Sequence, residues 1–505
     1  MPEKGASSRA SAFHPDGIQS AIGQLTTLIQ SLYRDDQIPW VVGYSGGKDS
    51  TATLQLVWNA IAGLPPRERT KPVHVISTDT LVENPVVALW VDQSLQAMDN
   101  AIAASGLPFH THRLSPEVQD RFWVNLIGKG YPTPRPKFRW CTSRLKISPS
   151  NRFITDVVRQ NGEAILVLGT RKAESTARHA SMKRHEHSTR DFLSKNSDPS
   201  LDRTWVFTPI AEWSNDDVWE YLVQVANPWG YDNSMLFDMY RGATKDKECP
   251  LVVDTGTPSC GDSRFGCFVC TLVDKDKSME AMLQNDAEKQ WMAPLVRIRN
   301  EYLDTNDRHQ RDFRRMNGSL MVHNDRLVHG PYKQEFRATL LREVLRAQQE
   351  VRRLGPPDVR DFELLTLEDL EEIRRVWVME KHEIEDRLPA IYEEATNSPY
   401  PGLERDSFLP FMPDELALLK EVCGSQDDPD GLLYQLIREL MHIEHQHRTL
   451  VRRNGLYEAL ESAFQRGSFT NEAEAEEFAL FRDRALQTEA LDGLSGPSDS
   501  HRIGA

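Results

Sequence analysis

The sequence has few cysteines and no long apolar run. Six cysteines in 505 residues are too few for a disulfide framework. No stretch approaches the roughly 18 consecutive apolar residues of a membrane-spanning helix, and the N-terminal residues lack the apolar core of a secretory signal. We therefore expect a cytoplasmic protein without a membrane partner, in which clustered cysteines bind metal or take part in chemistry.

The charge is unevenly distributed along the chain. The formal net charge of −15 weighs against nucleic-acid binding when taken alone. However, residues 129–210 hold 16 Lys or Arg and 7 Asp or Glu, whereas residues 358–430 hold 21 Asp or Glu and 7 Lys or Arg. A basic first half can bind phosphates while the acidic segment packs elsewhere or meets a protein partner. Ordinary solvated faces explain both segments equally well.

Four apolar segments of strand length predict a sheet. They alternate with segments of helical periodicity and lie at residues 39–44, 71–79, 107–114 and 163–170. Hydrophobic residues make up 39% of the chain, which is ample for a core. We predict an α/β fold, with a parallel sheet covered by helices on both faces, followed by a mostly α-helical C-terminal region.

These patterns divide the chain into five parts. We predict a disordered lead (1–17), an α/β domain (18–244), a cysteine-rich loop (245–277), a helical region (278–490) and a disordered tail (491–505). The sequence shows no internal repeat. The length suits about three domains, or one catalytic domain with helical additions.

The most specific local motif is SGGKDS at residues 45–50, between a predicted strand and a predicted helix. Adjacent glycines let backbone amides approach an anion, and the helix N-terminus adds its dipole. Ser45, Ser50 and Thr51 offer hydroxyl donors. A Walker A loop is excluded, because it would need Gly at position 42 and Ser or Thr at position 49, which are Val42 and Asp49. The alternative is a glycine-rich turn without a ligand.

The SGGKDS motif resembles the PP-loop of ATP pyrophosphatases, which cleave ATP to AMP and pyrophosphate. RWCTSRLK (139–146), GTRKAESTAR (169–178) and PIAEWSNDDVWEYL (209–222) resemble the phosphoadenylylsulfate (PAPS) reductase-like branch of that superfamily. The resemblance covers roughly residues 35–275. Together with the helical C-terminal half, the chain most resembles the Dnd-type DNA phosphorothioation sulfurtransferases, which take part in replacing a non-bridging backbone oxygen of DNA with sulfur.

This resemblance implies an enzyme with ATP, Mg²⁺ and DNA as ligands, a cysteine desulfurase as sulfur donor, and other proteins of a modification complex as partners. Lys48 would stabilise the departing pyrophosphate and Asp49 would hold Mg²⁺. Asp79 follows the second strand, where it either touches ATP or metal or caps a loop. The predicted ATP-binding residues are Ser45, Gly46, Gly47, Lys48, Asp49, Ser50, Asp79, Gly169 and Arg171, and the predicted phosphate or DNA clamp is Lys137, Arg139 and Arg178.

Four cysteines lie within one short segment. Cys249, Cys260, Cys267 and Cys270 fall in a stretch without its own apolar core, which favours a metal site. Zinc usually prefers two CxxC pairs, and only the last two cysteines form one. The irregular spacing resembles iron–sulfur ligation in the Dnd-type family, so we expect a [4Fe-4S] cluster over zinc, with unligated structural cysteines as the remaining alternative.

Cys141 stands apart, within RWCTSRLK. Arg139, Arg144 and Lys146 surround it in sequence, and nearby cations favour the thiolate. We predict that Cys141 is catalytic, as the sulfur carrier. A buried packing cysteine and a cluster ligand are the alternatives.

The predicted function is therefore ATP pyrophosphatase and sulfurtransferase of DNA phosphorothioate modification. A sulfonucleotide (PAPS) reductase is a second enzymatic alternative. A nucleotide-regulated iron–sulfur scaffold without catalysis is a third. The helical region after residue 278 has no obvious task in a reductase that acts on a small nucleotide.

Overall fold

The computed structural model describes residues 11–174, 192–243, 265–402, 413–424, 431–448, 450 and 452–494. The chain forms two compact units. The first comprises residues 1–122, 134–303 and 350–362, and the second comprises residues 123–133, 304–349 and 363–505.

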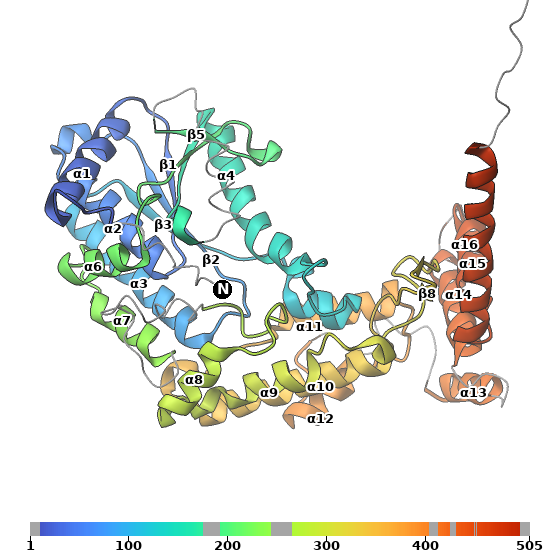
Figure 1. Cartoon of the computed structure of the whole chain (residues 1–505). Helices are drawn as coiled ribbons and strands as arrows, with labels where there is room; N and C mark the ends of the chain where they lie inside the picture. Colours follow the sequence, from blue (N-terminus) through green and yellow to red (C-terminus); the bar gives the residue numbers. More distant parts are fainter. Residues whose placement is uncertain are drawn as a thin grey trace, which may run out of the picture. The chain divides into compact units, whose positions relative to one another are not determined.

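A six-stranded sheet organises the first unit, in the order β3-β2-β1-β4-β6-β5 (Figure 1). Its strands are β1 (Trp40–Gly43), β2 (Val73–Thr78), β3 (Phe109–Leu114), β4 (Ala164–Val167), β5 (Ser194–Lys195) and β6 (Thr204–Phe207). All neighbours are parallel except β5 and β6. The predicted, mostly parallel sheet is confirmed. The antiparallel edge strand β5 was not predicted, because two residues carry no detectable alternation.

Helices cover both faces of this sheet, because successive side chains of a strand point to opposite sides. The Trp40 ring lies 5.7 Å from that of Tyr33 in α1 (Ile18–Arg34). Its neighbour Val41 belongs to a buried cluster with Ile154 and Val157 of α4 (Ser148–Asn161). The remaining longer helices of this unit are α2 (Lys48–Ala62), α3 (Pro85–Ser105), α6 (Asn215–Gln224), α7 (Asn233–Gly242), α8 (Lys277–Asn285) and α9 (Ala293–Tyr302).

Both predicted disordered ends need correction. The Ser11 hydroxyl donates to Asp217 Oδ1 at 2.5 Å, and the buried Phe13 ring lies edge-on to Trp213 at 5.1 Å. The predicted disordered lead is therefore wrong from residue 11 onward. Residues 491–494, assigned to the disordered tail, continue the last helix. Of the helix expected after residue 170, the structure describes one 3₁₀ turn, Lys172–Glu174, and the rest lies outside the described residues.

The second unit is mostly helical, as predicted. It contains α11 (Leu367–Arg375), α12 (Leu388–Thr396), α13 (Pro413–Cys423), α14 (Leu432–Arg448), α15 (Leu456–Gly467), α16 (Glu472–Leu494), most of α10 (Gln334–Leu354), and a hairpin of β7 (Val322–His323) and β8 (Arg326–Leu327). Phe313, Leu327, Leu432 and Ala479 share one of its buried clusters. No helix in the described ranges is both long and apolar enough to cross a membrane.

Candidate active site

The loop between β1 and α2 turns on Gly46. Its φ of +71° lies in the left-handed region, and a Cβ there would stand 2.4 Å from Val91 Cγ2. The indole N–H of Trp90, in α3, donates to the Gly46 carbonyl at 3.0 Å. The motif needs glycine here for both backbone conformation and space. No local sequence signal pointed to Trp90.

Two hydroxyl groups that were predicted as phosphate donors form hydrogen bonds within the loop itself. The side chains of Ser50 and Thr51 each donate to the Gly47 carbonyl at 2.9 Å. The backbone N–H of Ser45 in turn donates to Ser50 Oγ at 3.2 Å. Gly47 is the residue just before α2, and no side chain caps this helix N-terminus. Backbone amides at an uncapped helix N-terminus favour the binding of an anion.

Asp49 lies between two cations. Its Oδ1 accepts from Arg171 Nε at 2.7 Å, and its Oδ2 lies 3.3 Å from Lys48 Nζ. Arg171 is 4% exposed and also donates from Nη1 to the Trp213 carbonyl at 3.3 Å. The sequence placed Arg171 among the ATP-binding residues without predicting its partner. The structure brings Lys48, Asp49 and Arg171 together, although the last lies 122 positions along the chain.

Gly169 allows that approach. It follows β4, and a Cβ on it would stand 2.7 Å from the Asp49 carbonyl oxygen and 3.0 Å from Thr53 Oγ1. Any larger residue would push the start of α2 away from the sheet. Gly169 therefore lies behind the phosphate loop, and its role in binding ATP stays a prediction.

Tyr240 of α7 is a residue of this site that sequence reasoning missed. The backbone N–H of Lys48 donates to its hydroxyl at 3.4 Å, and Lys48 Nζ lies 5.5 Å from its ring centroid. Burial, helped by the nearby Asp49 carboxylate, raises the pKa of Tyr240, so the hydroxyl stays protonated. Nothing in its local sequence separates this tyrosine from an ordinary core aromatic.

Asp79 has the geometry of a loop cap. Its Oδ1 accepts from the backbone N–H of Leu81 at 2.8 Å, and its Oδ2 lies 3.2 Å from Arg113 Nη2. Both oxygens therefore stabilise the turn after β2, which lies at the same edge of the sheet as the phosphate loop. This geometry is that of the loop cap, and contact of Asp79 with ATP or metal stays a prediction.

The cysteine segment is attached to that same turn. Phe268 donates its N–H to the Val82 carbonyl at 3.0 Å, and Cys267 pairs with Glu83 in an antiparallel bridge. The Thr80 hydroxyl lies 3.4 Å from Cys267 Sγ. Cys267 therefore lies at the carboxyl edge of the sheet, beside β2, the strand next to the one that leads into the phosphate loop.

Cys141 lies near Cys270, and Lys146 faces both of them and Cys267. Cys249 and Cys260 lie outside the described residues. Within the described ranges, no three His, Cys, Asp or Glu side chains are close enough to hold a metal ion. The donor set still suits an iron–sulfur group, because the thiols are soft ligands and the Lys146 ammonium would offset the negative charge of a thiolate-bound cluster.

The expectation that cations lower the pKa of Cys141 is wrong. Burial is the largest effect on this thiol and raises its pKa. Of the three cations near it in sequence, Arg144 pairs with Asp120 at 2.5 Å, and Lys146 interacts most strongly with Cys267. Burial also raises the pKa of Cys267, while Lys146 opposes that rise.

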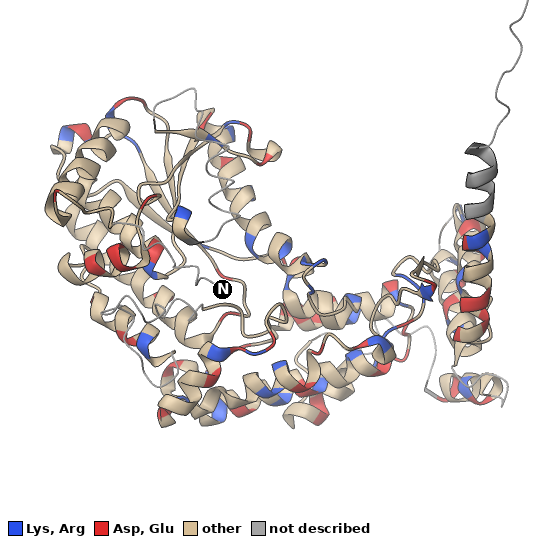
Figure 2. Cartoon of the chain, in the orientation of Figure 1, with Lys and Arg blue, Asp and Glu red and all other residues tan. Residues whose placement is uncertain are grey.

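The clamp candidates lie on an exposed turn. Arg135 and Phe138 exchange two backbone hydrogen bonds of 3.1 and 2.8 Å, which close the turn and leave Lys137 and Arg139 exposed. Phe138 is 44% exposed between them. Further Lys and Arg recur along the segment that leads into α4 (Figure 2). Arg178 lies outside the described residues.

Residues 39–229 match the phosphoadenosine phosphosulfate reductase domain family, which is less than half of the chain. An uncharacterized protein of Methanocaldococcus jannaschii is 25% identical over 256 residues, and this alignment covers 51% of the present chain and 40% of the relative. The chain therefore spans well under half the length of that curated relative.

The solved structures that match the chain share little sequence with it. PAPS reductase from Candida auris in a phosphate complex is 15% identical, with 43% of this chain and 91% of that chain covered and a TM-score of 0.25. FMN adenylyltransferase from Candida glabrata with FMN and an ATP analogue is 13% identical, with 42% and 61% covered and a TM-score of 0.25. The U34-tRNA thiolase from Methanococcus maripaludis with its [4Fe-4S] cluster is 14% identical, with 57% and 82% covered and a TM-score of 0.27.

Proposed function

We propose that the protein is an ATP pyrophosphatase and sulfurtransferase that acts on the DNA backbone, and that residues 39–229, which match the phosphoadenosine phosphosulfate reductase domain family, form a nucleotide-binding domain of the PP-loop superfamily. One observation carries this proposal. The phosphate loop follows β1, the cysteine segment pairs with the turn after β2, and these strands are parallel neighbours. Phosphate activation and sulfur delivery can therefore take place at one edge of the sheet.

The ATP half of the reaction belongs to the loop. The amides of Gly46 and Gly47, together with Lys48, would stabilise the negative charge of pyrophosphate as it leaves the α-phosphorus. A non-bridging oxygen of the DNA phosphate attacks that phosphorus, so the phosphate is adenylated and pyrophosphate departs. Arg171 is buried and fixed by Asp49, and Asp49 Oδ2 would be the oxygen that holds Mg²⁺.

The sulfur half of the reaction belongs to Cys141. A cysteine desulfurase would load it as a persulfide, whose terminal sulfur attacks the adenylated phosphorus while AMP leaves. One thiol then attacks Cys141 Sγ, which releases the DNA phosphorothioate and leaves a mixed disulfide, and a second thiol resolves that disulfide to free the Cys141 thiol; the two thiols supply the two electrons and leave as a disulfide. Cys249, Cys260, Cys267 and Cys270 would hold a [4Fe-4S] cluster, which when bound supplies one-electron redox chemistry.

The exposed turn supports DNA as the substrate. Lys137 and Arg139 present two cations to solvent, and Phe138 stands between them. Cations interleaved with an aromatic ring suit a phosphate backbone with bases beside it. The acidic stretch between residues 358 and 430 is our candidate surface for the other proteins of the modification complex.

A sulfonucleotide reductase is the second candidate, favoured by the family named in the domain match. That reaction would need a thiol to attack the sulfur of PAPS, with release of sulfite, and no DNA. The two functions therefore differ in both substrate and product.

The deciding experiment uses full-length protein purified without oxygen. Incubated with ATP, Mg²⁺, duplex DNA, cysteine and a cysteine desulfurase, it should release AMP and pyrophosphate in equal amounts, and nuclease digestion of the DNA should yield phosphorothioate dinucleotides. A Lys48→Ala protein is the matched control and should produce neither. Formation of ADP instead of AMP would remove the pyrophosphatase assignment, and sulfite release from PAPS without DNA would establish the reductase.

A further inference from the structure

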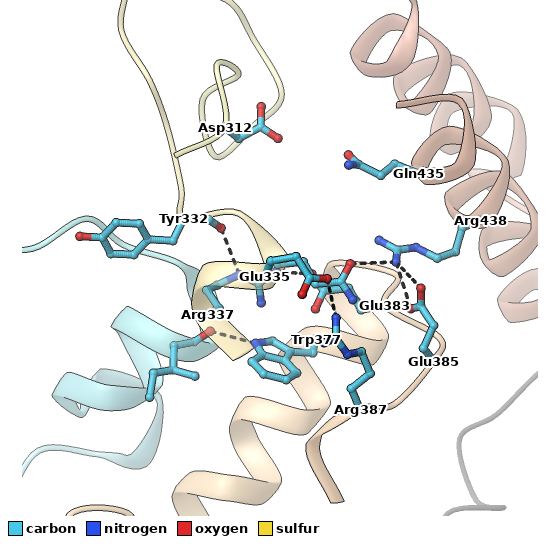
Figure 3. Close-up of polar contacts among 12 residues, drawn as sticks. Asp312, Tyr332, Glu335, Arg337, Trp377, Glu383, Glu385, Arg387, Gln435 and Arg438 are labelled. Atoms are coloured by element: carbon cyan, nitrogen blue, oxygen red, sulfur yellow. Dashed lines mark hydrogen bonds and ion pairs between the residues drawn. The ribbon is translucent and has the colours of Figure 1, made fainter. Parts of the chain in front are cut away.

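The second unit contains a cavity of about 690 Å³ that the proposed reaction does not use. It is lined by the loop 312–318, the start of α10, residues 380–387 and one face of α14 (Figure 3). Ligand sites for small molecules commonly measure about 300–1,000 Å³. The lining is strongly charged, and each of these elements contributes both acidic and basic side chains.

Most carboxylates around this cavity already have a cationic partner. The ion pairs are Arg337–Glu383, Arg438–Glu385 at 2.9 Å, Arg314–Asp312 at 2.7 Å, Arg387–Glu335 at 2.5 Å and Arg466–Glu439. The Tyr434 hydroxyl also donates to Glu385 at 2.8 Å. The lining carboxylates therefore carry little uncompensated negative charge.

Lys381 differs from these cations. Among the described residues its ammonium has no hydrogen-bond or ion-pair partner, and the side chain borders the cavity beside Arg337. Burial, with the Arg337 guanidinium, lowers its pKa to about 8, although Glu383, Asp312 and Glu380 act in the opposite direction. At neutral pH it is still an ammonium. Lys381 is half-buried, and a partly desolvated ammonium without a partner is unfavourable, so an anion in the cavity would offset that cost.

Two buried arginines leave further donors unused. Arg337 is 2% exposed and lies over the Trp377 ring at 5.2 Å, and its Nη1 has no partner among the described residues. Arg438 is 5% exposed, and its Nε also has no partner among the described residues. Glu383 Oε2 is a buried acceptor without a partner. The groups with unused capacity are therefore three donors and one acceptor.

We propose that this cavity binds a phosphate group, as a second phosphate site separate from the loop after β1. Tetrahedral phosphate offers several acceptor oxygens to the Lys381 ammonium, and the buried guanidinium groups of Arg337 and Arg438 in the lining favour its negative charge. The group belongs either to a free nucleotide or to the DNA backbone. The proposal is independent of the chemistry assigned to the first unit.

The test counts phosphate sites by calorimetry with inorganic phosphate at pH 7. The parent protein should bind two phosphates, Lys48→Ala should retain the cavity site, and Lys381→Met should lose it. Losing a hydrogen bond to a charged group should weaken binding at the cavity by about tenfold or more. Lys381→Arg keeps the charge and should bind like the parent. Arg326→Ala, which removes an exposed cation of β8 outside the lining, is the matched control.

Two further titrations identify the source of the phosphate. If a nucleotide occupies the cavity, Lys381→Met should weaken AMP binding in the Lys48→Ala background and leave duplex affinity unchanged. If DNA occupies it, the same variant should weaken duplex binding and leave AMP unaffected.

The outcomes separate this proposal from the proposed function. Equal phosphate stoichiometry and affinity in the parent, Lys381→Met and Arg326→Ala proteins would overturn the cavity site, whatever the first unit does. Loss of pyrophosphate release in Lys48→Ala, with phosphate still bound in the cavity, would support both proposals independently.

Discussion

Arg171 Nε lies 2.7 Å from Asp49 Oδ1, so a buried guanidinium joins the segment after β4 to the first turn of α2. Asp49 is therefore part of the structure of the site, in addition to its proposed role with Mg²⁺. Its other neighbour, Lys48, lies at a looser 3.3 Å. The two adjacent residues of the motif thus differ in what the fold requires of them.

This difference predicts different effects of Lys48→Ala and Asp49→Ala. Both variants should lose about a hundredfold in pyrophosphate release, because each removes an electrostatic contact in the transition state. Asp49→Ala should also lower the free energy of unfolding by about 3 kcal/mol, because it leaves the Arg171 charge buried without a carboxylate. Lys48→Ala should stay within about 0.5 kcal/mol of the parent.

Urea denaturation of both variants, beside pyrophosphate assays, checks this prediction. Equal midpoints for Asp49→Ala and the parent protein would show that Arg171 does not depend on Asp49. Parent-level pyrophosphate release in both variants would remove the phosphate-loop assignment.

The second prediction concerns space behind the loop. Gly169→Ala places a methyl group 2.7 Å from the Asp49 carbonyl oxygen, which is backbone and cannot turn aside. We expect a loss of about 1–3 kcal/mol in unfolding free energy, together with reduced pyrophosphate release, because the start of α2 must shift. Gly23→Ala, within α1 and with nothing within 4 Å of the added methyl, should be neutral or stabilising by up to about 1 kcal/mol. Thermal melts of the Gly169→Ala, Gly23→Ala and parent proteins measure these differences in stability.

The sheet could be predicted from sequence because its strands are short apolar runs bounded by glycine, proline and polar residues. Trp40–Gly43 and Ala164–Val167 lie within predicted strands. The phosphate loop was predictable for the same reason, since glycines, lysine and aspartate are adjacent in the chain.

The partners of these residues could not be predicted, because they come from distant segments. Trp90, Tyr240 and Arg113 contact the site through tertiary packing, and their local sequences are those of ordinary amphipathic elements. The pKa of Cys141 was misjudged for a related reason. Three cations adjacent in sequence suggested a lowered pKa, whereas burial and the Arg144–Asp120 pair depend on the fold.

The third prediction concerns metal content. Protein purified without oxygen should be brown and contain about four iron and four sulfide per chain, as a [4Fe-4S] cluster requires. Cys267→Ala and Cys270→Ala should each bleach it. Cys423→Ala, which removes a buried cysteine of α13, is the control and should stay brown. One zinc per chain and no sulfide would replace the cluster with a structural zinc site.

The fourth prediction separates sulfur carriage from ligation at Cys141. Cys141→Ser cannot hold a persulfide, so it should abolish phosphorothioate formation in cells while keeping the brown cluster and pyrophosphate release. Mass spectrometry after treatment with a desulfurase should find one added sulfur on the parent protein and none on the variant. A bleached variant would instead make Cys141 a ligand, and unchanged phosphorothioate levels would remove it from the mechanism.

The last prediction uses the pH dependence of Lys381. Its pKa falls to about 8 in the folded protein, below the ordinary value of 10.5, so between these pH values the unfolded chain binds more protons than the folded one. The free energy of unfolding must then rise with pH across this window, and the cost of holding the half-buried ammonium is fully present below pH 8. Lys381→Met should therefore be more stable than the parent at pH 7, by about 1–3 kcal/mol, because one pKa unit corresponds to about 1.4 kcal/mol.

The stability advantage of Lys381→Met should shrink as pH rises from 8 toward 10.5, and phosphate should reduce it at pH 7 by stabilising only the parent. Urea denaturation of both proteins at pH 7 and pH 10, with and without phosphate, measures the difference. A pH-independent gap between them would mean that Lys381 does not titrate in this range, and its stability effect would then come from packing alone.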